Sequence, residues 1–158
     1  MKRNLLYALL CLQIVGLAVL YGFYAAGLSS PSYLLETEPV DPRDYFRGDY
    51  IILNYKISRL PEHQKNSHFR ENQNVDVTLK KTGDFWVIRN VTDSMPPTKD
   101  FPVLRARLSG DTLLYDIEKY FVPEGEGNPR GKITVAIVIR PDGQAQIKQL
   151  YNDGKPWP

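Results

Sequence analysis

The chain opens on a long apolar run and then changes to short, alternating segments. Residues 5–28 carry no charge and are almost wholly apolar, with Gln13 as the main polar interruption. This run of 24 residues is longer than the roughly 20 apolar residues that cross a bilayer core as a helix. The pattern predicts an N-terminal transmembrane anchor over residues 1–28, followed by a separate domain over residues 29–158.

Charges at the ends of this run predict its orientation. Lys2 and Arg3 precede the run, and no charged residue follows until Glu36. Positively charged flanks remain on the cytoplasmic side of a membrane. We therefore expect a single-pass protein of the inner or cytoplasmic membrane, with its N-terminus inside and the remaining domain outside the cytoplasm.

A cleaved signal peptide is the main alternative for this segment. Signal peptides have apolar regions of about 7–15 residues followed by a small-residue cleavage site. The run here is longer, but Ala25, Ala26 and Gly27 supply small residues near its end, so the sequence leaves cleavage open. A buried core helix fits less well, because the segment has no polar face.

After residue 30 the pattern is that of short strands separated by turns. Alternation is clearest at residues 75–79, where Val75, Val77 and Leu79 predict one buried face. Turns at residues 82–84 and 141–143 predict two hairpins. The strands that we expect cover residues 33–37, 50–57, 75–79, 85–91, 103–108, 112–115, 132–140 and 144–151. Residues 117–122 fit either a strand or one helical turn.

Many short strands without a long helical pattern are typical of all-β domains. The fold class that we expect is therefore mostly β: a small antiparallel β sandwich or partly open barrel after the single transmembrane helix. About 120 residues are enough to bury one core.

Composition excludes several classes of function. The chain of 158 residues has 20 basic and 18 acidic residues, and residues 28–158 carry 18 of each sign. A neutral domain with scattered charges argues against a nucleic-acid partner. Cys11 is the single cysteine and lies in the apolar run, which excludes a disulfide framework and cysteine-based metal clusters.

One eight-residue string stands out at residues 48–55, which read GDYIILNY. Glycine permits backbone conformations that other residues resist, and aspartate stabilises turns through its carboxylate. Leu53 is expected in the core, and Tyr55 is expected to be buried while Tyr50 remains accessible. The interpretation that we favour is structural for Gly48, Asp49, Tyr50, Leu53 and Tyr55. A binding surface formed by Arg47, Asp49 and the two tyrosines is the alternative.

This string resembles, position for position, the one that names the GDYXXLXY protein family. Residues 41–47 and 120–125 also resemble recurrent stretches of that family. The resemblance implies a bacterial, membrane-anchored β domain of unknown biochemical function, often encoded beside a multi-pass membrane protein. It implies no catalytic residue.

A second, weaker resemblance is to an enzyme. Ser94 begins a Ser-Met-Pro-Pro-Thr stretch, and residues 47–49 read Arg-Gly-Asp; both pieces are similar to parts of signal peptidase I, which activates a serine with a lysine. Their order here is reversed, and no lysine lies between Arg3 and Lys56. A membrane-anchored serine hydrolase with Ser94 as nucleophile remains the alternative function.

Other residues with chemical potential fit solvated loops better than sites. His63 and His68, with Glu62 and Glu71, could ligate a metal, but they fall in a polar loop. Acidic pairs also occur in turn regions, at residues 41 and 44 and at residues 124 and 126. We therefore assign no catalytic, metal-binding or cofactor-binding residue and expect no cofactor. The expected function is a non-catalytic binding or accessory module for a membrane partner, such as a multi-pass membrane protein.

Overall fold

The chain divides into an N-terminal helical unit, Met1–Pro31, and a β domain, Ser32–Pro158. The computed structural model describes residues 2–28, 31–38, 50–65, 69–94, 100–122, 129 and 131–157. Gly48, Asp49 and His68 lie outside the described residues, as do residues 41–47, 95–98 and 123–126.

The N-terminal unit is the helix α1, Lys2–Leu28. Its side chains are described at Tyr7 and at residues 9–22, and all of these are exposed on every side of the helix. Within the part of the chain that is described, no helix is both long enough and apolar enough to cross a membrane. The helical conformation expected for this segment is thus found, whereas the expected transmembrane span is not.

The first sheet of the β domain has the strand order β1-β8-β9-β10. Its strands are β1, Ser32–Glu36, β8, Ile133–Ile139, β9, Ala145–Asn152, and β10, Lys155–Trp157. All three pairings are antiparallel. Asp153 and Gly154 both have positive φ, at 50° and 77°, as the tight turn between β9 and β10 requires.

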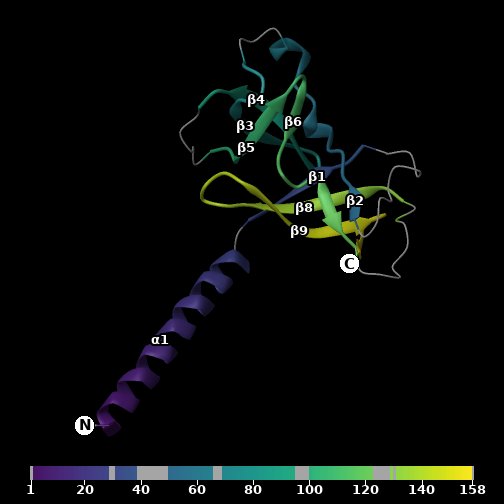
Figure 1. The fold of residues 1–158 in the computed structure, drawn as a ribbon. Coiled ribbons are helices and arrows are strands. Elements are labelled where there is room, and N and C mark those ends of the chain that lie inside the picture. Colours follow the sequence, from purple (N-terminus) through teal and green to yellow (C-terminus); the bar gives the residue numbers. More distant parts are fainter. Residues whose placement is uncertain are drawn as a thin grey trace. The chain divides into compact units, whose positions relative to one another are not determined.

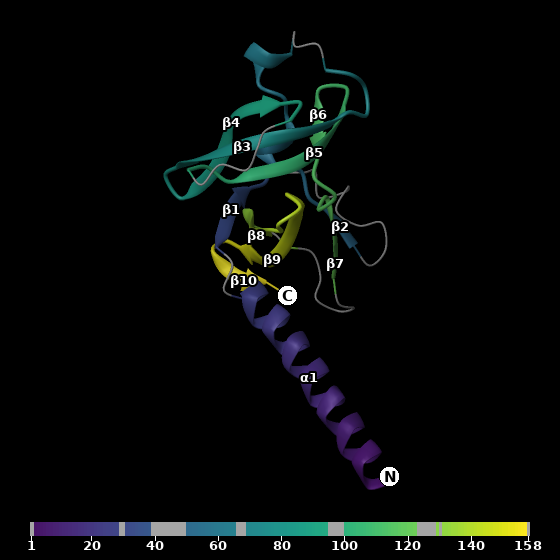
Figure 2. The same ribbon diagram turned by 90° about the vertical axis from the view of Figure 1, so that its left-hand side faces the viewer.

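The second sheet has the order β4-β3-β5-β6 and is also antiparallel. Its strands are β3, Asn74–Thr82, β4, Phe85–Thr92, β5, Val103–Ser109, and β6, Thr112–Leu114. Both tight hairpins turn at a glycine with positive φ, Gly83 between β3 and β4 and Gly110 between β5 and β6. Figures 1 and 2 show this sheet and the first sheet as separate parts of the β domain.

A short two-stranded ribbon completes the described strands. It pairs β2, Tyr50–Ile52, with β7, Lys119–Phe121. Two single-turn 3₁₀ helices, Lys56–Ser58 and Glu62–Gln64, follow β2. An isolated bridge between Thr37 and Tyr55 connects the end of β1 to the chain just after β2.

Both sheets and the ribbon contribute to a common core. The buried cluster takes Leu35 from β1, Ile51 from β2, Leu79 from β3, Leu104 from β5 and Val135 from β8. At the edge of this core Tyr33 packs against Trp86 with 5.0 Å between ring centroids, so β1 of the first sheet contacts β4 of the second. The mostly β, antiparallel fold class is therefore confirmed.

Two strand predictions need correction, and one strand was missed. The strand expected over residues 50–57 ends at Ile52, and the 3₁₀ turn Lys56–Ser58 takes the place of its last part. On β3 the alternation does not mark a solvent face, because Asp76 and Thr78 are buried together with the apolar residues. Strand β10 was not predicted at all. Residues 117–122, left open between strand and helix, contain the strand β7.

Candidate functional site

The described part of the family string runs from a partly exposed edge into the core. Tyr50 begins β2 and is half-buried, whereas Ile51, Leu53 and Tyr55 are buried. Beyond β2 the chain stays attached to β7, since the Leu53 N–H donates to the Glu118 carbonyl at 2.7 Å. The expectation that Tyr55 is more buried than Tyr50 is confirmed, with Tyr55 only 1% exposed.

Tyr55 has a reciprocal partner in Tyr115. The Tyr55 hydroxyl donates to the Ile117 carbonyl at 2.8 Å, and the Tyr115 hydroxyl donates to the Ile57 carbonyl at 2.7 Å. Each tyrosine therefore binds the backbone two residues beyond the other tyrosine. These two bonds join the chain after β2 to the chain before β7, and they satisfy hydroxyl groups that are costly to bury without a partner.

The surroundings keep both hydroxyls neutral. Burial raises the pKa of Tyr55, and the carboxylate of Glu118 raises it further. The same two causes raise the pKa of Tyr115 well above its ordinary value. Glu118 is fixed there because its carboxylate accepts the backbone N–H of Tyr115. Neutral, hydrogen-bonded phenols suit a structural brace and not a catalytic base.

A groove of about 420 Å³ lies beside this brace, between β7 and β9. Figure 2 shows the two strands near one another in the β domain. The lining residues come from the β7 region and from the first half of β9: Asp116, Ile117, Lys119, Tyr120, Phe121, Ala145, Gln146 and Ile147. Phe121 is 74% exposed, which is unusual for a large aromatic side chain.

Tyr50 connects the family string to this groove. Its ring packs edge-on against Phe121 with 6.1 Å between centroids, and the Lys119 ammonium lies 5.3 Å from the Tyr50 ring centroid. Farther along, Tyr120 packs against Trp157 of β10 with 6.5 Å between centroids. The groove therefore has an aromatic border and one exposed lysine.

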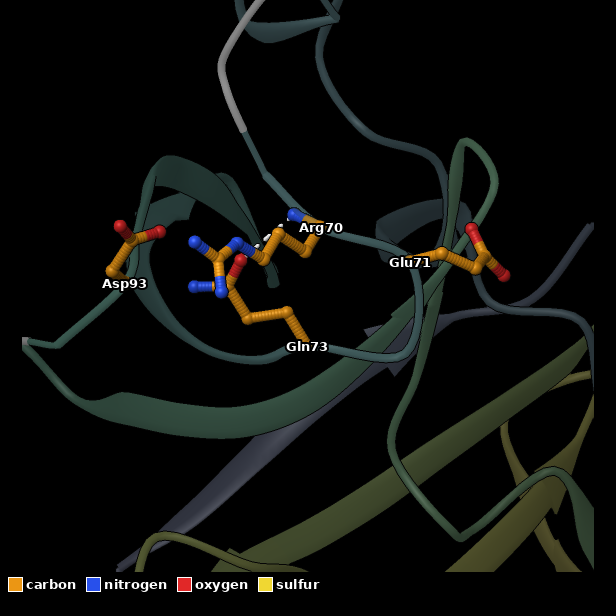
Figure 3. Close-up of a pocket in the computed structure, with 4 residues that line it drawn as sticks. All are labelled: Arg70, Glu71, Gln73 and Asp93. Atoms are coloured by element: carbon orange, nitrogen blue, oxygen red, sulfur yellow. Dashed lines mark hydrogen bonds between the residues drawn. The ribbon is translucent and has the colours of Figure 1, made fainter.

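A second cavity, of about 490 Å³, is lined by Arg70, Glu71, Gln73 and Asp93. Figure 3 shows the Glu71 carboxylate directed away from the Arg70 guanidinium. Glu71 accepts the Gly110 N–H at 2.8 Å, and the Gln73 side chain accepts the Arg70 N–H at 2.8 Å. The side chains of Glu71 and Gln73 thus bind backbone N–H groups and stabilise the loop before β3. The four side chains that line this cavity include no reactive pair.

The described residues that could serve catalysis or metal binding are not brought together. Ser94 is exposed, and among the described residues no lysine or histidine side chain is found hydrogen-bonded to it. His63 is exposed on the 3₁₀ turn Glu62–Gln64. No group of three or more metal-ligating side chains occurs in the described part of the chain. Glu62 pairs with Lys65 and Glu71 accepts a backbone N–H, which accounts for both carboxylates.

Sequence reasoning did not identify the groove. Its most exposed aromatic residue, Phe121, lies far along the chain from Tyr50, and only the pairing of β2 with β7 brings them together. The available signal was the second recurrent stretch at residues 120–125, which begins at this strand.

These features define a mostly β, antiparallel domain that follows an N-terminal helix. The chain matches the GDYXXLXY protein family over residues 14–150 and belongs to that family. No match was found among curated proteins or among solved structures.

Proposed function

We propose that this GDYXXLXY protein is a membrane-anchored accessory protein whose β domain binds a membrane partner without catalysing a reaction. The observation that carries the proposal is the apolar surface of α1. Leu9, Leu10, Leu12 and Val15 are each more than half exposed, and at about 100° per residue they lie on different sides of the helix. A helix that is apolar all round is stable only when lipid or protein surrounds it.

The sequence around α1 supports lipid as that surrounding. The uncharged run extends over residues 4–35, and Lys2 with Arg3 precedes it. Under the positive-inside rule the β domain then lies outside the cytoplasm. The exposed Phe121 and the groove beside it give the domain a surface suited to a protein partner.

A matched pair of substitutions in α1 tests the anchor. Ile14→Arg places a charge near the middle of the apolar run, where it opposes insertion by about 2.5–3.5 kcal/mol, whereas Ile14→Leu does not. We expect the native chain and Ile14→Leu to remain with membranes after alkaline carbonate washing, and Ile14→Arg to be released in part. Equal release of all three would contradict the anchor.

Orientation and partner binding need separate measurements. Protease added to intact spheroplasts should digest the β domain, and protection of residues after 30 would contradict the orientation. Purification of the full chain in mild detergent should recover a membrane protein in fixed proportion.

A reactive-serine probe should not label Ser94; labelling that is lost in Ser94→Ala would instead favour the hydrolase.

A further inference from the structure

The ribbon strand β7 has an outward edge whose backbone groups have no partner among the described residues. Leu53 and Glu118 form a hydrogen-bonded pair, and such pairs alternate with non-bonded pairs along an antiparallel ladder. The register of β2 with β7 then makes Lys119 and Phe121 the non-bonded positions. Their N–H and C=O groups point away from β2, and no partner for them is found among the described residues.

Strand β9 has a similar edge along its first half. The Arg140 N–H donates to the Gln144 carbonyl at 2.9 Å, so the next residue, Ala145, is a non-bonded position, and so is Ile147. Their backbone groups point away from β8. Strand β10 pairs only with residues 150–152 of β9, and no other described strand pairs with residues 145–149 on this side.

Both edges border the groove between β7 and β9. We propose that this groove binds an extended segment of the membrane partner, which adds as a strand to the uncovered edge of β9 and lies against β7. The proposal rests on the partner-binding function given above and names its site. Strand addition of this kind supplies affinity through main-chain hydrogen bonds, while alternate side chains supply specificity.

The side chains around the groove indicate the chemistry of that segment. Phe121 and Ile147 offer apolar contacts. Two charged side chains line the groove in the described structure, Asp116 and Lys119. The Asp116 carboxylate lies 3.8 Å from the Arg107 guanidinium, whereas Lys119 forms no ion pair with a described residue. The groove is therefore complementary to a segment with alternating apolar residues and a carboxylate that reaches Lys119.

Substitutions at three positions separate strand addition from other contacts. Ala145→Pro removes an outward N–H, which proline tolerates at the edge of a sheet, and Ala145→Val is its control because it keeps the N–H. Phe121→Ala removes the exposed ring. Lys119→Glu reverses the charge, with Lys80→Glu on the second sheet as its control. Thermal melting of each full-length variant in detergent shows whether it is folded.

We expect Ala145→Pro, Phe121→Ala and Lys119→Glu each to reduce recovery of the partner roughly tenfold, as loss of a central contact does. Ala145→Val and Lys80→Glu should recover it at the native level. Equal recovery by folded Ala145→Pro and Ala145→Val would overturn strand addition. If the native chain recovers no partner, the proposed function fails and this inference fails with it.

A photo-crosslinker identifies what occupies the groove. Phe121→p-benzoylphenylalanine, in the full chain in cells, should form an adduct with an extended segment of the partner, identified by mass spectrometry. The same probe at position 80 should not. No adduct above that of position 80, an adduct with lipid, or an adduct with a second copy of this chain would overturn the inference, even where a partner co-purifies.

Discussion

At the scale of single residues, the paired phenols of Tyr55 and Tyr115 explain why the family string ends in a tyrosine. A phenylalanine would fill the same space in the core, but it could not donate to the Ile117 carbonyl. That carbonyl would then be buried without its partner, which costs about 1–3 kcal/mol. The hydroxyl of Tyr55 thus joins two chain segments that are distant in sequence.

The first prediction follows from this bond. Tyr55→Phe should lower the free energy of unfolding of the β domain by about 1–3 kcal/mol, measured by denaturant titration. Tyr50→Phe is the control, because no hydrogen bond from the Tyr50 hydroxyl is found in the described structure, and it should change stability by less than about 0.5 kcal/mol. A larger loss for Tyr50→Phe would show that the brace is assigned to the wrong tyrosine.

Alkaline pH provides a second prediction. The pKa of Tyr55 and that of Tyr115 are raised in the folded domain, mainly by burial. Folding then favours the neutral phenols, and this contribution to stability is lost as pH rises above the ordinary tyrosine pKa of about 10. Stability should therefore fall steeply above that pH.

Absorbance at 295 nm, which reports ionised tyrosine, checks this expectation. The absorbance from Tyr55 and Tyr115 should appear only together with unfolding seen by circular dichroism. In the variant carrying Tyr55→Phe and Tyr115→Phe, the absorbance step that coincides with unfolding should be smaller. Ionisation of either tyrosine in the folded domain would contradict the burial argument.

At the scale of elements, local turn chemistry made the hairpins predictable. Gly83 and Gly143 lie at turns between neighbouring strands and both have positive φ, which glycine adopts readily. The signal for β10 was also local, since Asp153-Gly154 is a typical hairpin dipeptide. It was missed because the strand after it is only three residues long.

The ribbon of β2 and β7 could not be predicted in this way. Its strands are three residues each and pair across most of the domain sequence. Apolar alternation over residues 50–57 favoured a longer strand, but the bridge of Tyr55 to Thr37 and the turn after it redirect the chain. Because the groove is formed by this distant pairing, the candidate site was not visible in the sequence either.

Glu36 joins three elements through charge and gives a third prediction. Its carboxylate binds Lys132, just before β8, and also the Lys56 ammonium at 2.7 Å. Hydrogen bonds from Lys132 and then Lys56 lower the pKa of Glu36. The contribution of Glu36 to the free energy of unfolding is present above the ordinary glutamate pKa. It is lost as pH falls through the lowered pKa of Glu36 in the folded domain.

Glu36→Gln should therefore lower stability near neutral pH by about 1 kcal/mol, as expected for two partly exposed pairs. The native chain and the variant should become equally stable at strongly acidic pH, where the carboxylate is protonated. Denaturant titrations at several pH values measure both effects. Asp84→Asn is the control, because Asp84 is exposed and no ion pair of its carboxylate is found in the described structure. A difference between native and variant that does not change with pH would show that the lost interaction is not ionic.

At the scale of the whole molecule, the two units have different requirements for stability. In the described structure, the buried cluster of the β domain takes its residues from positions 35–150. The β domain thus has a buried core of its own, whereas the described apolar side chains of α1 are exposed. We expect the two units to depend on different surroundings, the first on a non-aqueous environment and the second on its own packing.

The last prediction is that residues 32–158 fold without the helix. Because all described residues of the buried cluster lie within this fragment, it should melt within about 4 °C of the full chain in detergent, a shift that corresponds to roughly 1 kcal/mol or less. A fragment that begins at residue 38 is the control, since it lacks β1 and with it Leu35 and the antiparallel partner of β8. It should fail to give a cooperative transition by circular dichroism. If the longer fragment also fails while the full chain folds, then α1 contributes to the stability of the β domain and the division into two independent units is wrong.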